Sequence, residues 1–133
     1  MKDLKNNISA LVGIFPQALS GTTDLVGQII DRQDWDGLTF VLQTDAIAIG
    51  SLAAQMLVEE GDAANLSDAA AVADAHLIGT EAATAIDETD DKVTKSIGYI
   101  GTKRYVRATL TVTTNAGTDV VGALAVLSHP RSV

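Results

Sequence analysis

The stretch DKVTKSIGYIGTKRYVRATLTVTT, residues 91–114, decides the fold class of this chain. Within it Val106, Ala108, Leu110 and Val112 alternate with tyrosine, arginine and threonine residues. A period of two is typical of a β-strand that buries one face and leaves the other in water. The segment therefore predicts the central strand of a small β-domain.

The same stretch carries much of the positive charge of the chain. It holds five of the nine cationic residues and both tyrosines. Two glycines, Gly98 and Gly101, bracket Tyr99 and Ile100 just before the alternating segment. The cationic residues are Lys92, Lys95, Lys103, Arg104 and Arg107.

Further short apolar segments, separated by turn signals, extend the prediction to the rest of the chain. Residues 52–60 fit a strand or a helix by composition, and their position between glycines favours a strand. We expect residues 93–100 and 102–114 to form a hairpin. Ser67 before an alanine run predicts one or two helical turns over residues 67–74. The expected strands are residues 24–31, 38–49, 52–60, 93–100, 102–114 and 120–127.

The expected fold is all-β, a β-sandwich or jelly-roll-like single domain with an N-terminal arm and at most one short helix. A chain of 133 residues fits one domain. We assign residues 1–22 to the arm and residues 23–133 to the β domain. The arm has an apolar run that ends at Pro16, and it packs either on its own domain or on a partner. Its short, interrupted pattern predicts a mature N-terminus rather than a signal peptide.

Composition and charge exclude several classes of function. The formal net charge is −8 and the pI is about 4.4, which argues against a general nucleic-acid binder and against an anionic membrane surface. No apolar run is long enough for a membrane helix. The chain has no cysteine, so thiolate metal sites, disulfides and cysteine nucleophiles are excluded.

No pattern of catalytic, cofactor-binding or metal-ligating residues is found, so we expect no enzyme and no cofactor. His76 and His129 are far apart and lie in no metal-ligand spacing. The acidic residues 87–91 faintly resemble a calcium loop, but the required order and the closing glutamate are missing, so a solvated loop is favoured. Residues 98–103 lack the order of a phosphate-binding loop.

The basic and aromatic residues of the central stretch allow two interpretations. They form either a salt-bridged strand face or an assembly contact with an acidic surface. Strand alternation would place Arg104 with Val106 on the apolar side, where an unpaired charge is costly. Arg104 would then need a carboxylate, from Glu59 and Glu60 or from residues 87–91. The candidate contact residues are Tyr99, Lys103, Arg104, Tyr105 and Arg107.

Self-association is expected from the distribution of apolar residues. Only 4% of the residues are aromatic, so the core must come from aliphatic side chains. Residues 120–127 (VVGALAVL) are wholly apolar, which predicts a strand buried on both faces or against a partner. The apolar residues of the N-terminal arm add to the apolar surface that is expected to be covered by another copy.

Residues 97–107, IGYIGTKRYVR, resemble a GYxGxKRYVR segment of short virion proteins of tailed bacteriophages. Upstream, Ile30-Asp31 and residues 38–44 (LTFVLQT) match a second segment, with Asp45 where glycine is common. Residues 57–62 and 120–131 match more loosely. The resemblance covers residues 25–131.

This resemblance implies a structural protein of the virion, namely a capsid decoration or cement protein. Its implied partners are the major capsid protein and further copies of itself, on the outer capsid surface of a virion assembled in the host cytoplasm. A tail or head–tail connector component is the nearest alternative. An alternative of another class is a small carbohydrate-binding β-sandwich, for which Trp35, Tyr99 and Tyr105 are the candidate stacking residues.

Overall fold

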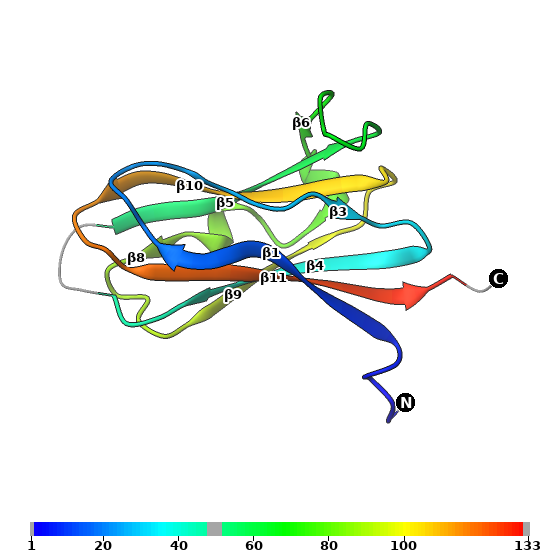
Figure 1. Ribbon diagram of the computed structural model, residues 1–133, viewed down its shortest axis with the longest axis horizontal. Coiled ribbons are helices and arrows are strands. Elements are labelled where there is room, and N and C mark those ends of the chain that lie inside the picture. The colour runs from blue at the N-terminus through cyan, green and yellow to red at the C-terminus, as the bar shows by residue number, and fades with distance from the viewer. Residues whose placement is uncertain (1, 48–51, 132–133) are drawn as a thin grey trace.

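Two antiparallel sheets pack face to face in the computed structural model, which describes residues 2–47 and 52–131 (Figure 1). One sheet has five strands in the order β1-β11-β4-β9-β7. The other has six strands, with β2-β10-β5-β6 in order, β3 beside β10 and β8 beside β5. The predicted all-β sandwich is therefore confirmed. The strands are β1 (Ile8–Ala18), β2 (Leu25–Val26), β3 (Ile30–Asp31), β4 (Trp35–Thr44), β5 (Leu52–Gly61), β6 (Ala70–Ala71), β7 (Leu77–Ile78), β8 (Ile86–Asp87), β9 (Thr94–Tyr99), β10 (Tyr105–Asn115) and β11 (Val120–Pro130).

The alternating segment of the sequence forms β10, which with β5 makes the centre of the six-stranded sheet. It pairs along its length with β5 and at two places with the short strands β2 and β3. Val106, Ala108, Leu110 and Val112 are buried, as the period of two predicts. The strand interpretation of residues 52–60 is confirmed by β5.

The core lies between the two sheets and is mostly aliphatic. Leu42, Met56 and Leu110 have no exposed surface, and Phe40 joins them from β4. Burying such side chains stabilises the fold by roughly 1.5–3 kcal/mol each. The aliphatic core expected from the low aromatic content is thus present, with Phe40 and Tyr99 as its largest members.

Of the two placements expected for the N-terminal segment, packing on its own domain is the one observed. Ile8–Ala18 forms β1, the edge strand of the five-stranded sheet, and pairs antiparallel with β11 from Ile8–Ser128 to Ala18–Val120. Two register shifts interrupt the ladder on either side of Ile14. β1 lies along β11 in Figure 1. Pairing with β11 and the buried Ile14 side chain hold this strand in place.

The expected hairpin between residues 93–100 and 102–114 is wrong. β9 pairs with β4 and β7 in the five-stranded sheet, whereas β10 belongs to the other sheet. Residues 100–104 therefore carry the chain from one sheet to the other. Local alternation predicts strands but does not say which sheet each one joins.

Two other local predictions also differ from the structure. Residues 67–74 form no α-helix: the Asp68 carboxylate accepts hydrogen bonds from the backbone N–H groups of Asp62 and Ala63, and Ala70–Ala71 form the short strand β6. The predicted strand 24–31 is divided into β2 and β3. At Gly27 a Cβ atom would lie 2.0 Å from the Ala108 oxygen, so the close approach there requires glycine.

The predicted strand over residues 38–49 corresponds to β4, which begins earlier, at Trp35, and ends at Thr44. Positions 48 and 49 lie outside the described residues. Helical structure in the described residues consists of two single 3₁₀ turns, Asp74–His76 and Ala82–Thr84. No helix among these residues is long and apolar enough to span a membrane.

Candidate functional site: an uncharged sheet face

Tyr99, the first predicted contact residue, is buried in the sandwich. Its side chain is 1% exposed, and its hydroxyl donates a hydrogen bond to the Glu60 carboxylate and accepts one from the Lys103 N–H at 3.0 Å. Burial and the Glu60 hydrogen bond raise the pKa of Tyr99 to about 12. Because Tyr99 comes from β9 and Glu60 from β5, this contact joins the two sheets. Tyr99 is therefore not a surface contact residue.

Arg32 is the important residue that the sequence analysis missed. It is 4% exposed, and its guanidinium lies 5.0 Å from the centre of the Tyr99 ring. It donates to the backbone oxygens of Lys103 at 2.9 Å and Gly101 at 3.1 Å. Two further bonds run to the oxygens of Trp35 and Asp36. Residues 100–104 are thus folded around Arg32 and Tyr99, which explains why this segment leaves one sheet for the other.

The three predicted cationic contact residues all pair with carboxylates of the same chain. Lys103 Nζ lies 2.7 Å from an Asp62 oxygen, and Arg107 Nη2 lies 3.1 Å from a Glu59 oxygen. The hydrogen bond to Asp62 raises the pKa of Lys103. The salt-bridged interpretation of this basic segment therefore agrees with the structure. The expected partners of Arg104 are wrong, however, because Glu59 pairs with Arg107 and Arg104 pairs with Asp31. Any role of these residues in assembly remains a prediction.

The prediction that Arg104 faces the apolar side is wrong. Its side chain is 47% exposed and forms a two-bond fork with Asp31 at 2.8 and 2.9 Å. It also donates to Gln33 at 2.7 Å and lies over the Tyr105 ring at 5.0 Å. The hydrogen bond between Arg104 and Asp31 lowers the pKa of the Asp31 carboxyl. The strand begins only at Tyr105, so its alternation does not extend to Arg104.

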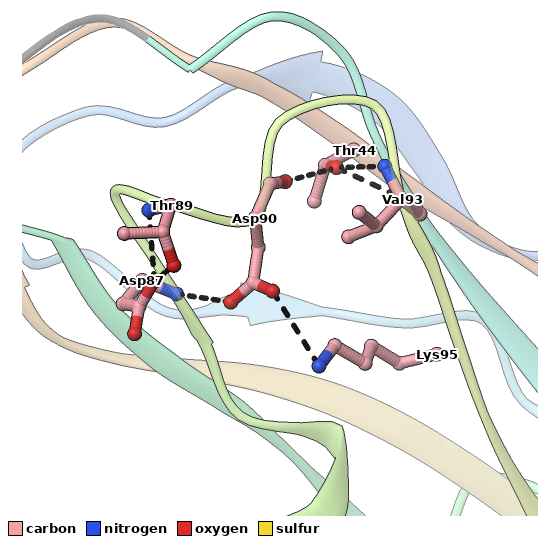
Figure 2. Close-up of polar contacts among 6 residues, drawn as sticks. All are labelled: Thr44, Asp87, Thr89, Asp90, Val93 and Lys95. Atoms are coloured by element: carbon pink, nitrogen blue, oxygen red, sulfur yellow. Dashed lines mark hydrogen bonds and ion pairs between the residues drawn. The ribbon is translucent and has the colours of Figure 1, made fainter.

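The acidic loop at residues 87–91 uses its carboxylates to hold its own backbone (Figure 2). The Asp90 carboxylate accepts a hydrogen bond from the Asp87 N–H at 2.8 Å and lies 3.5 Å from Lys95 Nζ. The Asp90 carbonyl accepts the Thr44 hydroxyl at 2.7 Å, and that hydroxyl accepts the Val93 N–H at 2.9 Å. Among the described residues no cluster of three metal-ligating side chains occurs. The loop therefore carries no support for a calcium site.

The outer face of the five-stranded sheet has a different character, because its central strands carry no charged side chain there. On β11, Val121, Ala123, Ala125 and Leu127 are buried, so the residues between them point outward. The strand register extends this assignment to β1, β4, β9 and β7. The outward positions are Ile8, Ala10, Val12, Thr39, Val41, Gln43, Ile78, Thr94, Ser96, Gly98, Val120, Gly122, Leu124, Val126 and Ser128, and we call this set the uncharged face.

A groove crosses one end of the uncharged face. It has a volume of about 370 Å³ and lies between the end of β4, the start of β11 and the bulged part of β1. Pro16 packs directly on Gly122, where a Cβ would lie 3.0 Å from the proline Cα. Val12 and Leu124 form its apolar rim, and Asp45 is the charged residue in its lining.

Exposed apolar side chains gather on the same two strands. Leu124 is 47% exposed, Phe15 is 53% exposed, and Leu11, Val12 and Val120 are exposed on β1 and β11 as well. The apolar strand at residues 120–127 is thus covered on one face only within this chain. By the strand register Val12, Val120 and Leu124 belong to the uncharged face, whereas Leu11 pairs with the inward-pointing Ala125 and faces the other side. Exposed apolar surface on one face marks an interaction site.

Comparisons with known proteins assign no family to the chain. No family model matches, and no curated protein matches. A solved structure that resembles it is an N-terminal endo-1,4-β-D-xylanase 10B of Clostridium thermocellum, containing CBM22-1 and GH10 modules in complex with xylohexaose. The match has 12% sequence identity and a TM-score of 0.42, and covers 96% of this chain and 27% of the xylanase chain.

Proposed function

We propose that this chain is a structural protein of a tailed-bacteriophage virion, a decoration or cement protein that binds the capsid shell through its uncharged face. The observation that carries the proposal is this face, in a protein whose net charge is −8. The virion assignment is supported by the resemblance of residues 97–107 to a segment of such proteins.

The distribution of charge fits a protein held on the outside of a shell. An apolar face gains about 25 cal/mol for each Å² that it removes from water, and a standard protein interface buries roughly 800 Å² on each partner. Apart from Asp36 of β4 and Asp45 in the groove lining, the acidic residues lie on loops, turns and the six-stranded sheet, where they keep the assembled surface soluble. A cement protein needs no catalytic group for this task.

The carbohydrate-binding alternative has less support from the arrangement of aromatic residues. Stacking on a sugar requires aromatic rings that share an exposed surface. Of the three candidates, Tyr99 is buried, Trp35 belongs to the five-stranded sheet and Tyr105 to the six-stranded sheet. These residues do not form one platform.

The proposal is tested with shells assembled from the major capsid protein encoded in the same genome. We expect the purified chain to pellet with these shells at a fixed ratio and to raise their melting temperature. Purified tails provide the control for the connector alternative, and a xylan column provides the control for the sugar-binding alternative. Binding to tails or xylan without binding to shells would overturn the proposal.

A further inference from the structure

Three of the four arginines of the chain line one small pocket at the end of the sandwich opposite the groove. The pocket has a volume of about 230 Å³ and is lined by Arg32, Gln33, Thr102, Arg104 and Arg131. These residues follow β3, precede β10 and follow β11. Backbone hydrogen bonds hold the segments together, from the Arg32 N–H to the Arg104 oxygen at 2.9 Å and from the Arg131 N–H to the Asp34 oxygen at 2.8 Å.

Arg32 is a buried charge whose contacts are carbonyl groups rather than a carboxylate. A guanidinium has five N–H donors. Four hydrogen bonds from Arg32 run to backbone oxygens, one of them from Nη2, so one Nη2 donor remains. A buried cation is stabilised by a nearby anion, and within the described part of the chain no carboxylate is bonded to Arg32.

The other two arginines also keep donors that their carboxylate partners do not use. Arg104 bonds Asp31 and Gln33 through Nε and Nη2, which leaves Nη1. Arg131 bonds Asp36 through Nε at 2.6 Å, which leaves both terminal nitrogens. Guanidinium groups match the oxygens of carboxylate and phosphate by paired hydrogen bonds. Arg131 retains such a pair of nitrogens, and Arg32 and Arg104 add single nitrogen donors to the same pocket lining.

We propose that this pocket binds a small oxyanion, a phosphate or the carboxylate of a small organic acid, through the remaining donors of Arg32, Arg104 and Arg131. Thr102 also lines the pocket, and a threonine hydroxyl is a neutral hydrogen-bond donor. Asp31 and Asp36 already pair with two of the arginines, and Asp34 acts electrostatically on Arg104. Because these carboxylates offset most of the positive charge, we expect weak binding, with a dissociation constant of about 1 mM.

The test is an NMR titration of the full chain with inorganic phosphate and, in a separate arm, with succinate, at constant ionic strength. We expect saturable shifts of the backbone amides around the pocket, at residues 32–36, 101–104 and 131. The arm with the lower dissociation constant identifies the source of the oxyanion. Shifts that do not saturate by about 50 mM in either arm would overturn the proposal.

Three variants separate a built site from general attraction of anions to positive charge. Arg131→Gln removes exposed donors from the pocket and should weaken binding about tenfold. Asp36→Asn releases Arg131 from its partner and should tighten binding. Arg107→Gln is the matched control. It changes the fourth arginine, which lies on the outer face of the six-stranded sheet, away from the pocket, and pairs with Glu59. Equal weakening by Arg131→Gln and Arg107→Gln, or weaker binding by Asp36→Asn, would contradict the proposal.

Discussion

The outer faces of the two sheets differ in how their outward side chains are paired. On the six-stranded sheet, Arg107 of β10 pairs with Glu59 of β5, and threonine hydroxyls of β10 donate to β5 carbonyls. On the five-stranded sheet the outward positions carry no charge, and Leu124 remains half exposed. The first face pairs most of its polar groups within the chain, although Arg107 Nε and Thr109 Oγ1 are buried without a hydrogen-bond partner among the described residues. The second face leaves apolar surface for another molecule.

This difference separates stability from binding. A substitution on the polar face removes an internal contact and should lower the free energy of unfolding. A substitution at an exposed position of the uncharged face removes no internal polar contact, so its effect should appear in binding. The two faces can therefore be tested independently.

The largest effect is expected from Leu124→Asp. A charge at the centre of the uncharged face must be desolvated on docking, so binding to capsid shells should weaken about 100-fold, or about 2.7 kcal/mol. Stability should change little because Leu124 is 47% exposed. Val26→Asp, at an exposed apolar position on β2 of the six-stranded sheet, is the matched control and should bind normally.

Sedimentation of the same variants tests the predicted self-association. Wild-type protein is expected to associate at micromolar concentration, and Leu124→Asp should shift it to monomer. Association that persists in Leu124→Asp would mean that copies meet through a different surface. Equal loss of shell binding in Leu124→Asp and Val26→Asp would contradict the assignment of the docking face.

The second largest effect is expected from Tyr99→Phe, at the contact that ties the two sheets together. The substitution removes a hydroxyl bonded to the Glu60 carboxylate and to the Lys103 N–H, so the free energy of unfolding should fall by about 2 kcal/mol. The control is Tyr105→Phe, whose ring is half-exposed. Similar losses in both variants would argue against a special role for Tyr99.

The raised pKa of Tyr99 adds a pH dependence to this prediction. Because folding raises the pKa from 10.0 to about 12, the folded state holds the phenol proton more tightly than the unfolded state. The stabilisation is therefore complete below pH 10 and is lost as the pH rises toward about 12. Urea unfolding between these limits should show the difference between wild type and Tyr99→Phe becoming smaller.

Local patterns of the sequence predict the strands well but not their partners. The period of two in β10 identifies the buried Val106, Ala108 and Leu110, because alternation is a property of a single strand. The assignment of β9 and β10 to different sheets depends on residues 100–104, whose carbonyls bind Arg32 about 70 positions earlier in the chain. No local pattern signals such a contact.

The candidate site was predicted only in part for the same reason. The wholly apolar residues 120–127 indicate a strand in need of cover, and this indication leads to the uncharged face. The outward positions of β4 and β9 are recognised as part of that face only once the pairing of these strands is known. Conversely, the clustered basic residues predicted an assembly contact, although their carboxylate partners lie within the same chain.

A smaller effect is expected from Arg107→Ala on the polar face. The ion pair with Glu59 is partly buried, with side chains 21% and 22% exposed, so its loss should lower the free energy of unfolding by about 1 kcal/mol. A double-mutant cycle with Glu59→Gln measures the pair itself. A coupling energy near zero would mean that packing rather than charge holds this face.

The smallest effect is expected from Arg104→Ala, because the pair with Asp31 is exposed on both sides. Water and salt screen such a pair, so the melting temperature at neutral pH should stay close to that of the wild type.

The pH dependence offers a more sensitive measurement. The hydrogen bond from Arg104 holds the pKa of Asp31 below its usual 3.8, so the small stabilisation is present above that pH and is lost as the pH falls through the lowered value. In Arg104→Ala this part of the acid-induced loss should be absent, and NMR titration of the Asp31 carboxyl should return its pKa toward the usual value. A large drop in melting temperature would instead show that Arg104 supports the loop around Arg32, and the polar face would then owe part of its stability to an exposed ion pair.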